Sequence, residues 1–324
     1  MSARTSVKCI VSPGGEPPAS KRKAARRREE RCGSSGGSCA FPEHASEYAR
    51  RLATRSPRFA LQVSAAGEKP ERTGRFGPDP FGELSGAAKC PGLKQRFPDR
   101  VLVMTTDKCF MNCRHCTRRG LFGKTTLADT PERLAACVEY VKAHPKVRDV
   151  LLSGGDILTL RDGEVMRFVD AFASLAQVEM VRVCTRALCA SPGRVTRSLA
   201  KRLGKSGKVW VNTQFNCADE VTREARDAAK ILVEAGVPVS CQTVLLKGVN
   251  DSPEEMLKLL RALSAARIRP YYVFMCDPVA GIGRFRVPLK RAREIERACA
   301  EGIGGLAMPR FVRDVPGAKR KMPI

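Results

Sequence analysis

Three closely spaced cysteines are the most chemically informative residues of this 324-residue chain. Cys109, Cys113 and Cys116 lie in the run CFMNCRHC, and no fourth cysteine stands near them. A [4Fe–4S] cluster normally takes four thiolates, so this spacing predicts a cluster with one iron left open to a small molecule. S-adenosylmethionine can bind such an iron through its amino and carboxylate groups. The alternatives are three unrelated thiols or a zinc site, but structural zinc usually adds a second close pair of ligands, which the sequence lacks.

Two neighbouring features favour the same cofactor. His115 stands between the last two cysteines, where an aromatic ring could lie against the adenine of S-adenosylmethionine. Further along, the run LLSGGD contains a glycine pair, and glycine lets a backbone approach a ligand closely. We expect the amino acid end of the cofactor to bind at the last four residues of this run, Ser153, Gly154, Gly155 and Asp156. The alternatives are a loop histidine without a role and an ordinary turn at the glycines.

Apolar runs alternate with helical patterns through most of the chain after residue 100. Strands are expected at Val101–Thr105, Val150–Ser153, Val178–Thr185, Val209–Phe215, Val237–Leu246 and Tyr271–Met275. Helices are expected at Pro131–Ala143, Glu164–Ala176, Arg194–Leu203, Ala218–Ala235, Pro253–Ala266 and Leu289–Ala300. Continuous apolar runs are typical of buried parallel strands, and their alternation with helices predicts parallel pairing.

The predicted fold class is therefore α/β: a partial (βα)6 TIM-like barrel with an N-terminal helical extension and a short C-terminal segment. Too few residues follow Ala300 for the alternative, a full barrel of eight units. Such barrels have their active sites at the carboxyl ends of the strands, and the motifs above fall there. The expected parts are a disordered basic tail over residues 1–42, the extension over 43–99, and the barrel with its C-terminal segment over 100–324.

The tail carries the run KRKAARRREER, which supplies part of a net charge of +25 and cannot bury a core. It could be a solvated tail, a transit segment or a nucleic-acid patch. No run of 18 uninterrupted apolar residues predicts a membrane span. Cysteines outside the cluster motif scatter through apolar stretches, as buried reduced thiols do: Cys137, Cys184, Cys241 and Cys276. We expect an intracellular protein, cytoplasmic, or organellar if the tail is a transit segment.

The extended motif CFMNCRHCTRRG resembles the lysine 2,3-aminomutase family of radical S-adenosylmethionine enzymes. The CRHCTRR part is more specific than the bare cysteine spacing, which marks only the superfamily. The resemblance covers about Asp79 to Ile324 in unbroken order, through the runs QRFPDRVL, LLSGGD, VNTQFN, QTVLLKGVND, YYVFMCD and FVRDVPGAKRKMP.

This resemblance implies pyridoxal 5′-phosphate (PLP) as a further cofactor. Lys321, seven residues beyond Asp314, holds the position of the family's PLP-binding lysine, with Lys319 as a competitor. Arg96 and Arg100 match arginines that contact the PLP phosphate, a use suited to the guanidinium group. A polar residue of the PLP site matches Gln242.

The resemblance also implies which residues bind the substrate. Arg118 matches the arginine that pairs with the substrate carboxylate, and Asp277 and Asp314 match two aspartates that bind the distal ammonium of lysine. The chain departs from the family at five positions near these sites. Histidine is common in the family at Gln95, Gln214 and Cys217, and tyrosine at Phe97 and Phe274.

The function expected from this resemblance is that of an isomerase, an aminomutase that moves the α-amino group of L-lysine to C3 to give β-lysine. The expected partners are a free amino acid and an electron donor for the cluster, with a homo-oligomer left open. Nucleic acid is not expected. The alternatives are an arginine 2,3-aminomutase, a radical S-adenosylmethionine enzyme without PLP that modifies RNA or protein, and a degenerate relative that only binds its ligands.

Overall fold

The computed structural model describes residues 41–66, 77, 79, 81–83, 90–121 and 130–324. Apart from residues 41 and 42, the predicted basic tail lies outside the described residues. The chain from Pro42 to Ile324 forms one unit, to which the following description applies. The predicted boundary at residue 99 falls within a single sheet, because β1 (Leu93–Phe97) pairs with β2 (Arg100–Thr106).

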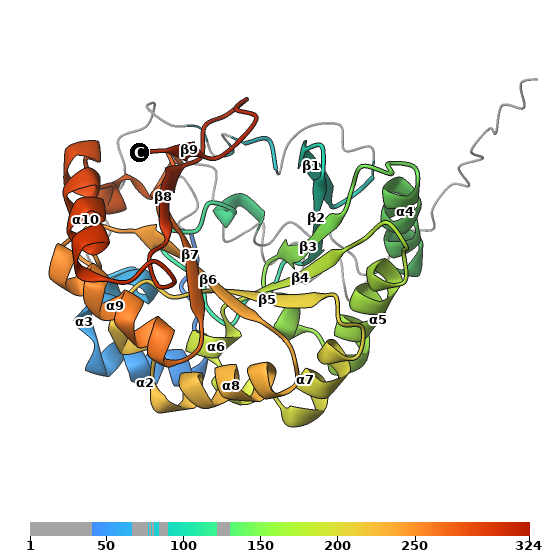
Figure 1. Cartoon of the computed structure of the whole chain (residues 1–324), viewed down its shortest axis with the longest axis horizontal. Coiled ribbons are helices and arrows are strands. Elements are labelled where there is room, and N and C mark those ends of the chain that lie inside the picture. Colours follow the sequence, from blue (N-terminus) through green and yellow to red (C-terminus); the bar gives the residue numbers. More distant parts are fainter. Residues whose placement is uncertain (1–40, 67–76, 78, 80, 84–89, 122–129) are drawn as a thin grey trace, which may run out of the picture. The chain divides into compact units, whose positions relative to one another are not determined.

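One sheet of nine strands, arranged in chain order, forms the centre of this unit (Figure 1). The parallel strands are β2, β3 (Asp149–Gly154), β4 (Met180–Thr185), β5 (Val209–Gln214), β6 (Val239–Leu245), β7 (Arg269–Met275) and β8 (Arg310–Arg313). The antiparallel strands β1 and β9 (Met322–Pro323) lie at its two ends and do not pair with each other. The described sheet is therefore an open, partial barrel, as predicted.

Helices cover the outer face of the curved sheet (Figure 1). The longer ones are α4 (Pro131–Lys142), α5 (Asp162–Ala173), α7 (Arg197–Gly204), α8 (Arg223–Glu234), α9 (Pro253–Ala265) and α10 (Leu289–Gly302). Two helices precede the sheet, α2 (Glu47–Arg55) and α3 (Pro57–Val63). Single-turn elements follow several strands: η1 (Arg119–Leu121), η2 (Ile157–Thr159), α6 (Ala187–Ala190), η3 (Pro192–Arg194), η4 (Ala218–Glu220) and η5 (Gly283–Phe285).

Side-chain alternation along the strands separates the core from the barrel interior. Val181 and Val183 of β4 are completely buried. The residues between and after them, Arg182 and Cys184, line the interior cavity instead. Since successive strand residues point to opposite faces, β4 contributes apolar residues to the helix layer and polar residues to the cavity.

Hydroxyl side chains fix where the covering helices begin. Thr130, Thr196, Thr222 and Ser252 each accept a hydrogen bond from the backbone N–H three residues later. This N-cap bond satisfies a donor that the first turn of a helix leaves free. The cap at Thr222 also explains one difference from the prediction: the helix expected over Ala218–Ala235 is divided into η4 and α8.

The six predicted strand–helix units are confirmed, with β2 to β7 as their strands. The sequence patterns missed β1, β8 and β9. β1 is a polar edge strand with the sequence LKQRF, and the other two have only four and two residues. None of them forms the continuous apolar run by which buried strands are recognised.

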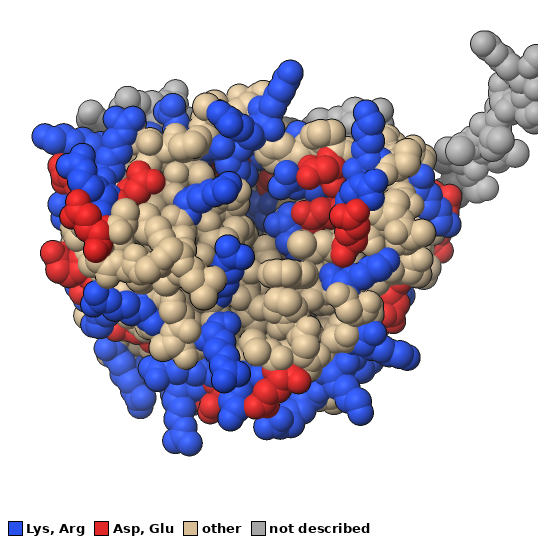
Figure 2. Space-filling model, in the orientation of Figure 1, with Lys and Arg blue, Asp and Glu red and all other residues tan. Residues whose placement is uncertain are grey.

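No described helix is long and apolar enough to span a membrane. The described cysteines are free thiols, and most of them are buried. Figure 2 shows Lys and Arg side chains spread across the drawn face, interrupted by groups of Asp and Glu.

Candidate active site

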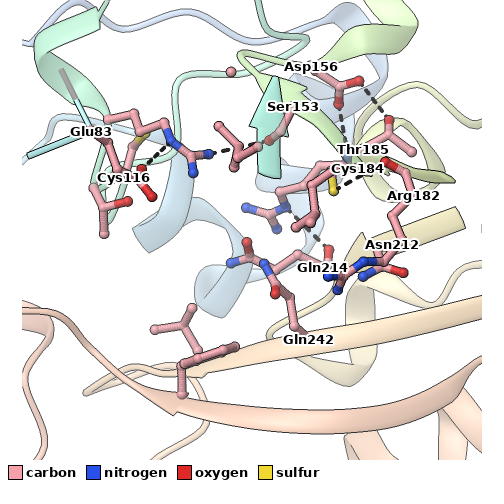
Figure 3. Close-up of a pocket in the computed structure, with 18 of the residues that line it drawn as sticks. Glu83, Cys116, Ser153, Asp156, Arg182, Cys184, Thr185, Asn212, Gln214 and Gln242 are labelled. Carbon is pink, nitrogen blue, oxygen red and sulfur yellow. Dashed lines mark hydrogen bonds and ion pairs between the residues drawn. The ribbon is translucent and has the colours of Figure 1, made fainter. Parts of the chain in front are cut away.

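A cavity of about 370 Å³ opens at the carboxyl ends of the parallel strands (Figure 3). This volume lies within the range of small-molecule sites. Every site residue predicted from the sequence lines it: Arg96, Arg100, Cys109, Cys113, His115, Cys116, Arg118, Ser153, Gly154, Gly155, Asp156, Gln242, Asp277, Asp314 and Lys321. The fold thus brings together residues that are up to 225 positions apart, from Arg96 to Lys321.

The cysteine loop follows β2 and is braced by the segment before the sheet. The backbone N–H of Arg114 donates to the carbonyl of Gln62 in α3 at 2.7 Å, and that of Asn112 donates to the carbonyl of His44 at 2.8 Å. Within the loop, the N–H of Cys116 donates to the carbonyl of Cys113 at 2.9 Å. These bonds fix the loop backbone, and nothing in the sequence pattern indicated that α3 takes part.

The three thiols of this loop are chemically suited to a cluster. Burial raises the pKa of Cys109 well above its ordinary value, and nearby Asp156 and the other two thiols raise it further. Burial and Cys113 raise the pKa of Cys116 to about 12. A metal removes such protons because it binds the thiolate. In an iron–sulfur cluster each thiolate binds a different iron.

The glycine pair allows the backbone after β3 to cross close to the backbone after β2. A Cβ at Gly155 would lie 2.2 Å from the carbonyl oxygen of Lys108, and one at Gly154, where φ is +107°, would lie 2.7 Å from that of Thr106. The N–H of Gly155 donates to the carbonyl of Thr106 at 2.6 Å. The sequence predicted that these glycines let the backbone approach a ligand. In this structure they let it approach the start of the cysteine loop.

Gly155→Ala is accordingly expected to displace the cysteine loop, lowering the free energy of unfolding by about 1–3 kcal/mol as overpacking does. The iron content after reconstitution should also be lower than in the wild type. The matched control is Gly163→Ala in α5, where nothing lies within 4 Å of the added methyl group. Thermal unfolding and iron assays decide the matter, and a Gly155→Ala protein as stable and iron-rich as the control would contradict this account.

Asp156 connects two loops at the rim of the cavity. Its carboxylate accepts hydrogen bonds from Thr185 Oγ1 at 2.7 Å, from the N–H of Arg186 at 2.7 Å and from the N–H of Leu158 at 3.0 Å. Figure 3 shows the bond to Thr185. Burial raises the pKa of Asp156. In this structure its carboxylate therefore organises the loops after β3 and β4.

His115 is buried as a neutral ring whose proton can be assigned. Asn216 Oδ1 accepts from the N–H of Val244 at 2.9 Å, which fixes the orientation of that amide. The Nδ2 of Asn216 consequently faces His115 Nε2 at 3.3 Å, and Gln214 Nε2 lies 3.0 Å from the same atom. Two amide donors leave Nε2 as an acceptor and place the proton on Nδ1. Burial lowers the pKa of His115 well below its usual value, so the ring is neutral.

The Nδ1 of His115 has no hydrogen-bond partner among the described residues. Buried donors of this kind are rare in folded proteins and call for a missing partner such as a ligand. The observation fits a bound nucleoside near the ring. Gln214, which stands where the family commonly has histidine, therefore keeps a polar contact with this position.

A second group of charges surrounds the C-terminal segment. Arg96 donates two hydrogen bonds to Asp314, at 3.0 and 2.8 Å. The ammonium of Lys321 forms an ion pair with the same carboxylate and lies 5.1 Å from the centre of the Phe274 ring. Burial opposes ionisation of Asp314, but the hydrogen bonds from these two cations outweigh it and lower its pKa. Lys319, the competitor, is exposed and is not among the residues lining the cavity.

These side chains fit a phosphate-bearing cofactor that binds a lysine. The guanidinium of Arg100 pairs with Asp99 at 2.9 Å and lies 4.7 Å from the centre of the Phe97 ring. Arg96 lies over the same ring at 5.5 Å. Two guanidinium groups and the ammonium of Lys321 therefore lie near one aromatic ring, and guanidinium groups are suited to binding a phosphate.

Asp277 differs from Asp314 because its carboxylate accepts no hydrogen bond from the described residues. Burial raises its pKa to about 7, with a further contribution from the negative charge of Asp314. A half-buried acid without a bonded partner is costly to ionise unless a cation binds beside it. The arrangement therefore favours a positively charged ligand group next to Asp277.

Arg118 holds a carboxylate already. Its Nε donates to Glu83 Oε2 at 2.7 Å and its Nη1 donates to Ser153 Oγ at 3.3 Å (Figure 3). Glu83 was not predicted from the sequence, since an isolated glutamate in an extension carries no signal. The guanidinium of Arg118 therefore already binds one carboxylate that lines the cavity.

Gln242 is positioned by a short polar chain across the barrel. Its Oε1 accepts from the hydroxyl of Tyr271 at 3.1 Å, and that hydroxyl accepts from Asn212 Nδ2 at 3.0 Å. These residues come from the neighbouring strands β5, β6 and β7. The sequence motifs contained all three residues, but only their strand register brings them into contact.

Comparison with solved structures supports the fold. A radical SAM methyltransferase from Sphaerobacter thermophilus superposes with a TM-score of 0.51 over 68% of this chain and 69% of that one, at 18% sequence identity. The model of the Radical SAM superfamily matches residues 103–260, which contain the cysteine loop and the strands β3 to β6.

Comparison with curated proteins identifies the family. An L-lysine 2,3-aminomutase of Acetoanaerobium sticklandii is 42% identical over 76% of this chain and 59% of its own length. A Treponema pallidum protein provisionally given the same name is 35% identical, over 76% of this chain and 69% of its own. A glutamate 2,3-aminomutase of Clostridioides difficile is 33% identical over 76% and 58%. The chain spans about three fifths of the length of the first and last of these. It belongs to the lysine 2,3-aminomutase family of radical S-adenosylmethionine enzymes.

Proposed function

We propose that this protein is an isomerase, a PLP-dependent 2,3-aminomutase that moves the α-amino group of L-lysine to C3 and yields β-lysine. The observation that carries the proposal is the composition of one cavity. Three thiols line one part of it, and Lys321 lines another, beside an acid that lacks a bonded partner. These are the groups that a radical source, an amine carrier and a cationic substrate require.

The cofactors would be held by separate sets of residues. Cys109, Cys113 and Cys116 would hold the cluster, and Lys321 would anchor PLP beside Arg96, Arg100 and Gln242. We place S-adenosylmethionine at His115 and at the run Ser153, Gly154, Gly155 and Asp156. When bound, the cluster and S-adenosylmethionine supply a carbon radical that removes a hydrogen atom, and PLP carries the migrating nitrogen.

The protein itself grips the two ends of the substrate. Arg118 would bind the α-carboxylate, which takes the place that Glu83 occupies in this structure. Asp277 and Asp314 would bind the distal ammonium. Fixing both ends leaves little freedom between them, so that C3 can be presented to the radical in one orientation.

The charges balance when the substrate replaces Lys321 as a cation. In this structure the ammonium of Lys321 is one of two cations bound to Asp314. Once the Lys321 nitrogen is committed to PLP, Asp314 loses that partner, and the ε-ammonium of lysine can restore it. A guanidinium would also suit two carboxylates, so arginine is the second candidate. A glutamate side chain would place a third carboxylate beside Asp277 and is disfavoured by like-charge repulsion.

The proposed partners are a free amino acid and a one-electron donor for the cluster. The cluster requires a reducing compartment. We therefore place the enzyme in the cytoplasm, or in an organelle if the basic run over residues 21–31 belongs to a transit segment.

The test is an anaerobic assay of the reconstituted full chain with S-adenosylmethionine, PLP and dithionite. L-lysine, L-arginine and L-glutamate are supplied separately, and β-amino acid products are measured. We expect β-lysine, with kcat/KM at least about tenfold lower for arginine, within the range that a pocket can discriminate. Turnover of arginine or glutamate in preference to lysine would overturn the substrate assignment, and 5′-deoxyadenosine formed only with RNA or a protein substrate would overturn the reaction class.

Asp277→Asn should lower kcat/KM for lysine by at least about tenfold, since a charge-assisted hydrogen bond contributes roughly 1.5–3 kcal/mol. In the wild type, KM for lysine should rise as pH falls below about 7, the pKa of Asp277. That rise should be absent from the variant. Kinetics measured across this pH range decide between a binding role and a structural one.

Stability supplies an independent readout for the same variant. Because burial raises the folded pKa of Asp277 above its ordinary 3.8, the free energy of unfolding should fall as pH rises between that value and about 7. The Asp277→Asn protein should therefore be the more stable one at pH 8. Unchanged lysine kinetics together with lower stability would mean that Asp277 is a structural residue.

A further inference from the structure

A buried ion pair lies directly behind the cysteine loop. Arg186, just after β4, donates from Nη1 to the sulfur of Cys113 at 3.0 Å and from Nη2 to Glu220 Oε2 at 2.7 Å. The side chains are 12% and 0% exposed. Arg186 was not among the residues predicted from the sequence, and it touches one of the three thiols assigned to the cluster.

Glu220 is locked in place by other hydrogen bonds. Its Oε1 accepts from the N–H of Asn216 at 2.9 Å, from the N–H of Cys217 at 3.0 Å and from Gln62 Nε2 at 2.8 Å. These three bonds fix the carboxylate, whose other oxygen holds the guanidinium of Arg186 beside the sulfur of Cys113.

The same network reaches the cysteine loop by a second route. Gln62 of α3 accepts a hydrogen bond from the backbone of Arg114 at its own carbonyl, at 2.7 Å. Its side-chain oxygen accepts from Arg186 Nη2 at 3.3 Å and from Asn216 Nδ2 at 2.8 Å. The helix before the barrel thus holds both the loop backbone and the cation that faces its sulfur.

A buried ion pair of this kind is not expected to add much to the free energy of unfolding. The cost of removing two charges from water often equals or exceeds what their attraction returns, and apolar residues can fill such a place equally well. A fixed cation beside a thiolate has a direct electrostatic effect, however. Hydrogen bonds to cluster sulfurs and nearby net charge are among the determinants of cluster reduction potential.

We propose that Arg186 is a positioning residue that raises the reduction potential of the cluster through its hydrogen bond to Cys113, with Glu220 limiting the effect. This inference rests on the proposed function for the presence of the cluster. The step concerned is [4Fe–4S]²⁺ plus one electron from the donor, giving [4Fe–4S]⁺. Arg186 remains protonated, and no bond to it forms or breaks. The added negative charge is stabilised by the guanidinium and opposed by the carboxylate.

The two partners should consequently act with opposite sign. Arg186→Met removes the cation and the donor while keeping much of the volume, so the midpoint potential should become more negative. Arg186→Lys keeps the charge and should shift it less. Glu220→Gln keeps the shape and removes the opposing charge, so the midpoint should become less negative. A role in packing alone would not produce shifts of opposite sign.

The experiment is a redox titration of the reconstituted full chain, followed by electron paramagnetic resonance of the reduced cluster. For Arg186→Met we expect the ratio of reduced to oxidised cluster at a fixed potential to fall about tenfold, which is 59 mV for one electron. The matched control is Arg194→Met. That guanidinium binds the carbonyls of Leu158 and Leu160 at 2.8 and 2.9 Å and touches no cysteine of the loop. Its midpoint should equal that of the wild type.

An unchanged midpoint in Arg186→Met with an intact cluster would overturn the inference, as would shifts of the same sign in Arg186→Met and Glu220→Gln. If Arg186→Met takes up no iron, opposite shifts in Arg186→Lys and Glu220→Gln uphold the inference and any other result overturns it. A wild-type protein that assembles no cluster would instead refute the proposed function itself.

Discussion

Lys321→Ala should lose the visible absorbance of bound PLP and mutase activity while keeping a full complement of iron. Lys321 lines the cavity beside Arg96 and Asp314, whereas the three thiols belong to the loop after β2. The two cofactors thus have separate anchors, so removing one should spare the other. We expect activity to fall at least about a hundredfold, the lower end of what a positioned reacting group contributes.

The variant should remain folded, because Arg96 still donates two hydrogen bonds to Asp314 after Lys321 is gone. Lys319→Ala is the matched control: it removes a lysine of the same segment that is exposed. It should keep PLP and activity. If Lys319→Ala loses PLP and Lys321→Ala retains it, the lysine has been misassigned.

Replacing any one of Cys109, Cys113 or Cys116 with alanine should abolish the brown cluster absorbance together with 5′-deoxyadenosine formation. Each thiolate would bind a different iron, so no single one can be replaced by the others. Cys184→Ala is the appropriate control, because Cys184 lines the same cavity from β4 but lies outside the loop. It should keep its iron. A triple variant that retains a [4Fe–4S] spectrum would refute the assignment.

The barrel could be predicted from the sequence because apolar residues recur regularly along its strands. The buried valines of β2 and β4 recur at every second position, and threonine caps precede α4 and α7. β8 and β9 carry no such pattern, yet Arg310–Arg313 extends the parallel sheet and Met322–Pro323 closes its end. Short strands depend on neighbours that are distant in sequence, and periodicity contains no information about them.

The sequence predicted many residues of the site, but it did not predict which of them contact one another. Motifs located many of the residues that line the cavity, although not Glu83 or Arg186. Arg96 and Asp314 are separated by 218 positions, and only the fold places their charges in contact. The same holds for Arg186 and Cys113, 73 positions apart. Gly155 was expected to admit a ligand, and the structure adds a second reason for it, the crossing of its backbone with Lys108.

The most direct test of the proposed function follows the migrating nitrogen itself. L-lysine labelled with ¹⁵N at the α-amino group and ¹³C at C3 is incubated anaerobically with the reconstituted enzyme, and the product is examined by ¹³C nuclear magnetic resonance. We predict a one-bond ¹³C–¹⁵N coupling at C3, since the same nitrogen moves between adjacent carbons of one molecule. Formation of 5′-deoxyadenosine while the ¹⁵N stays on C2 would contradict the assignment of this protein as an aminomutase.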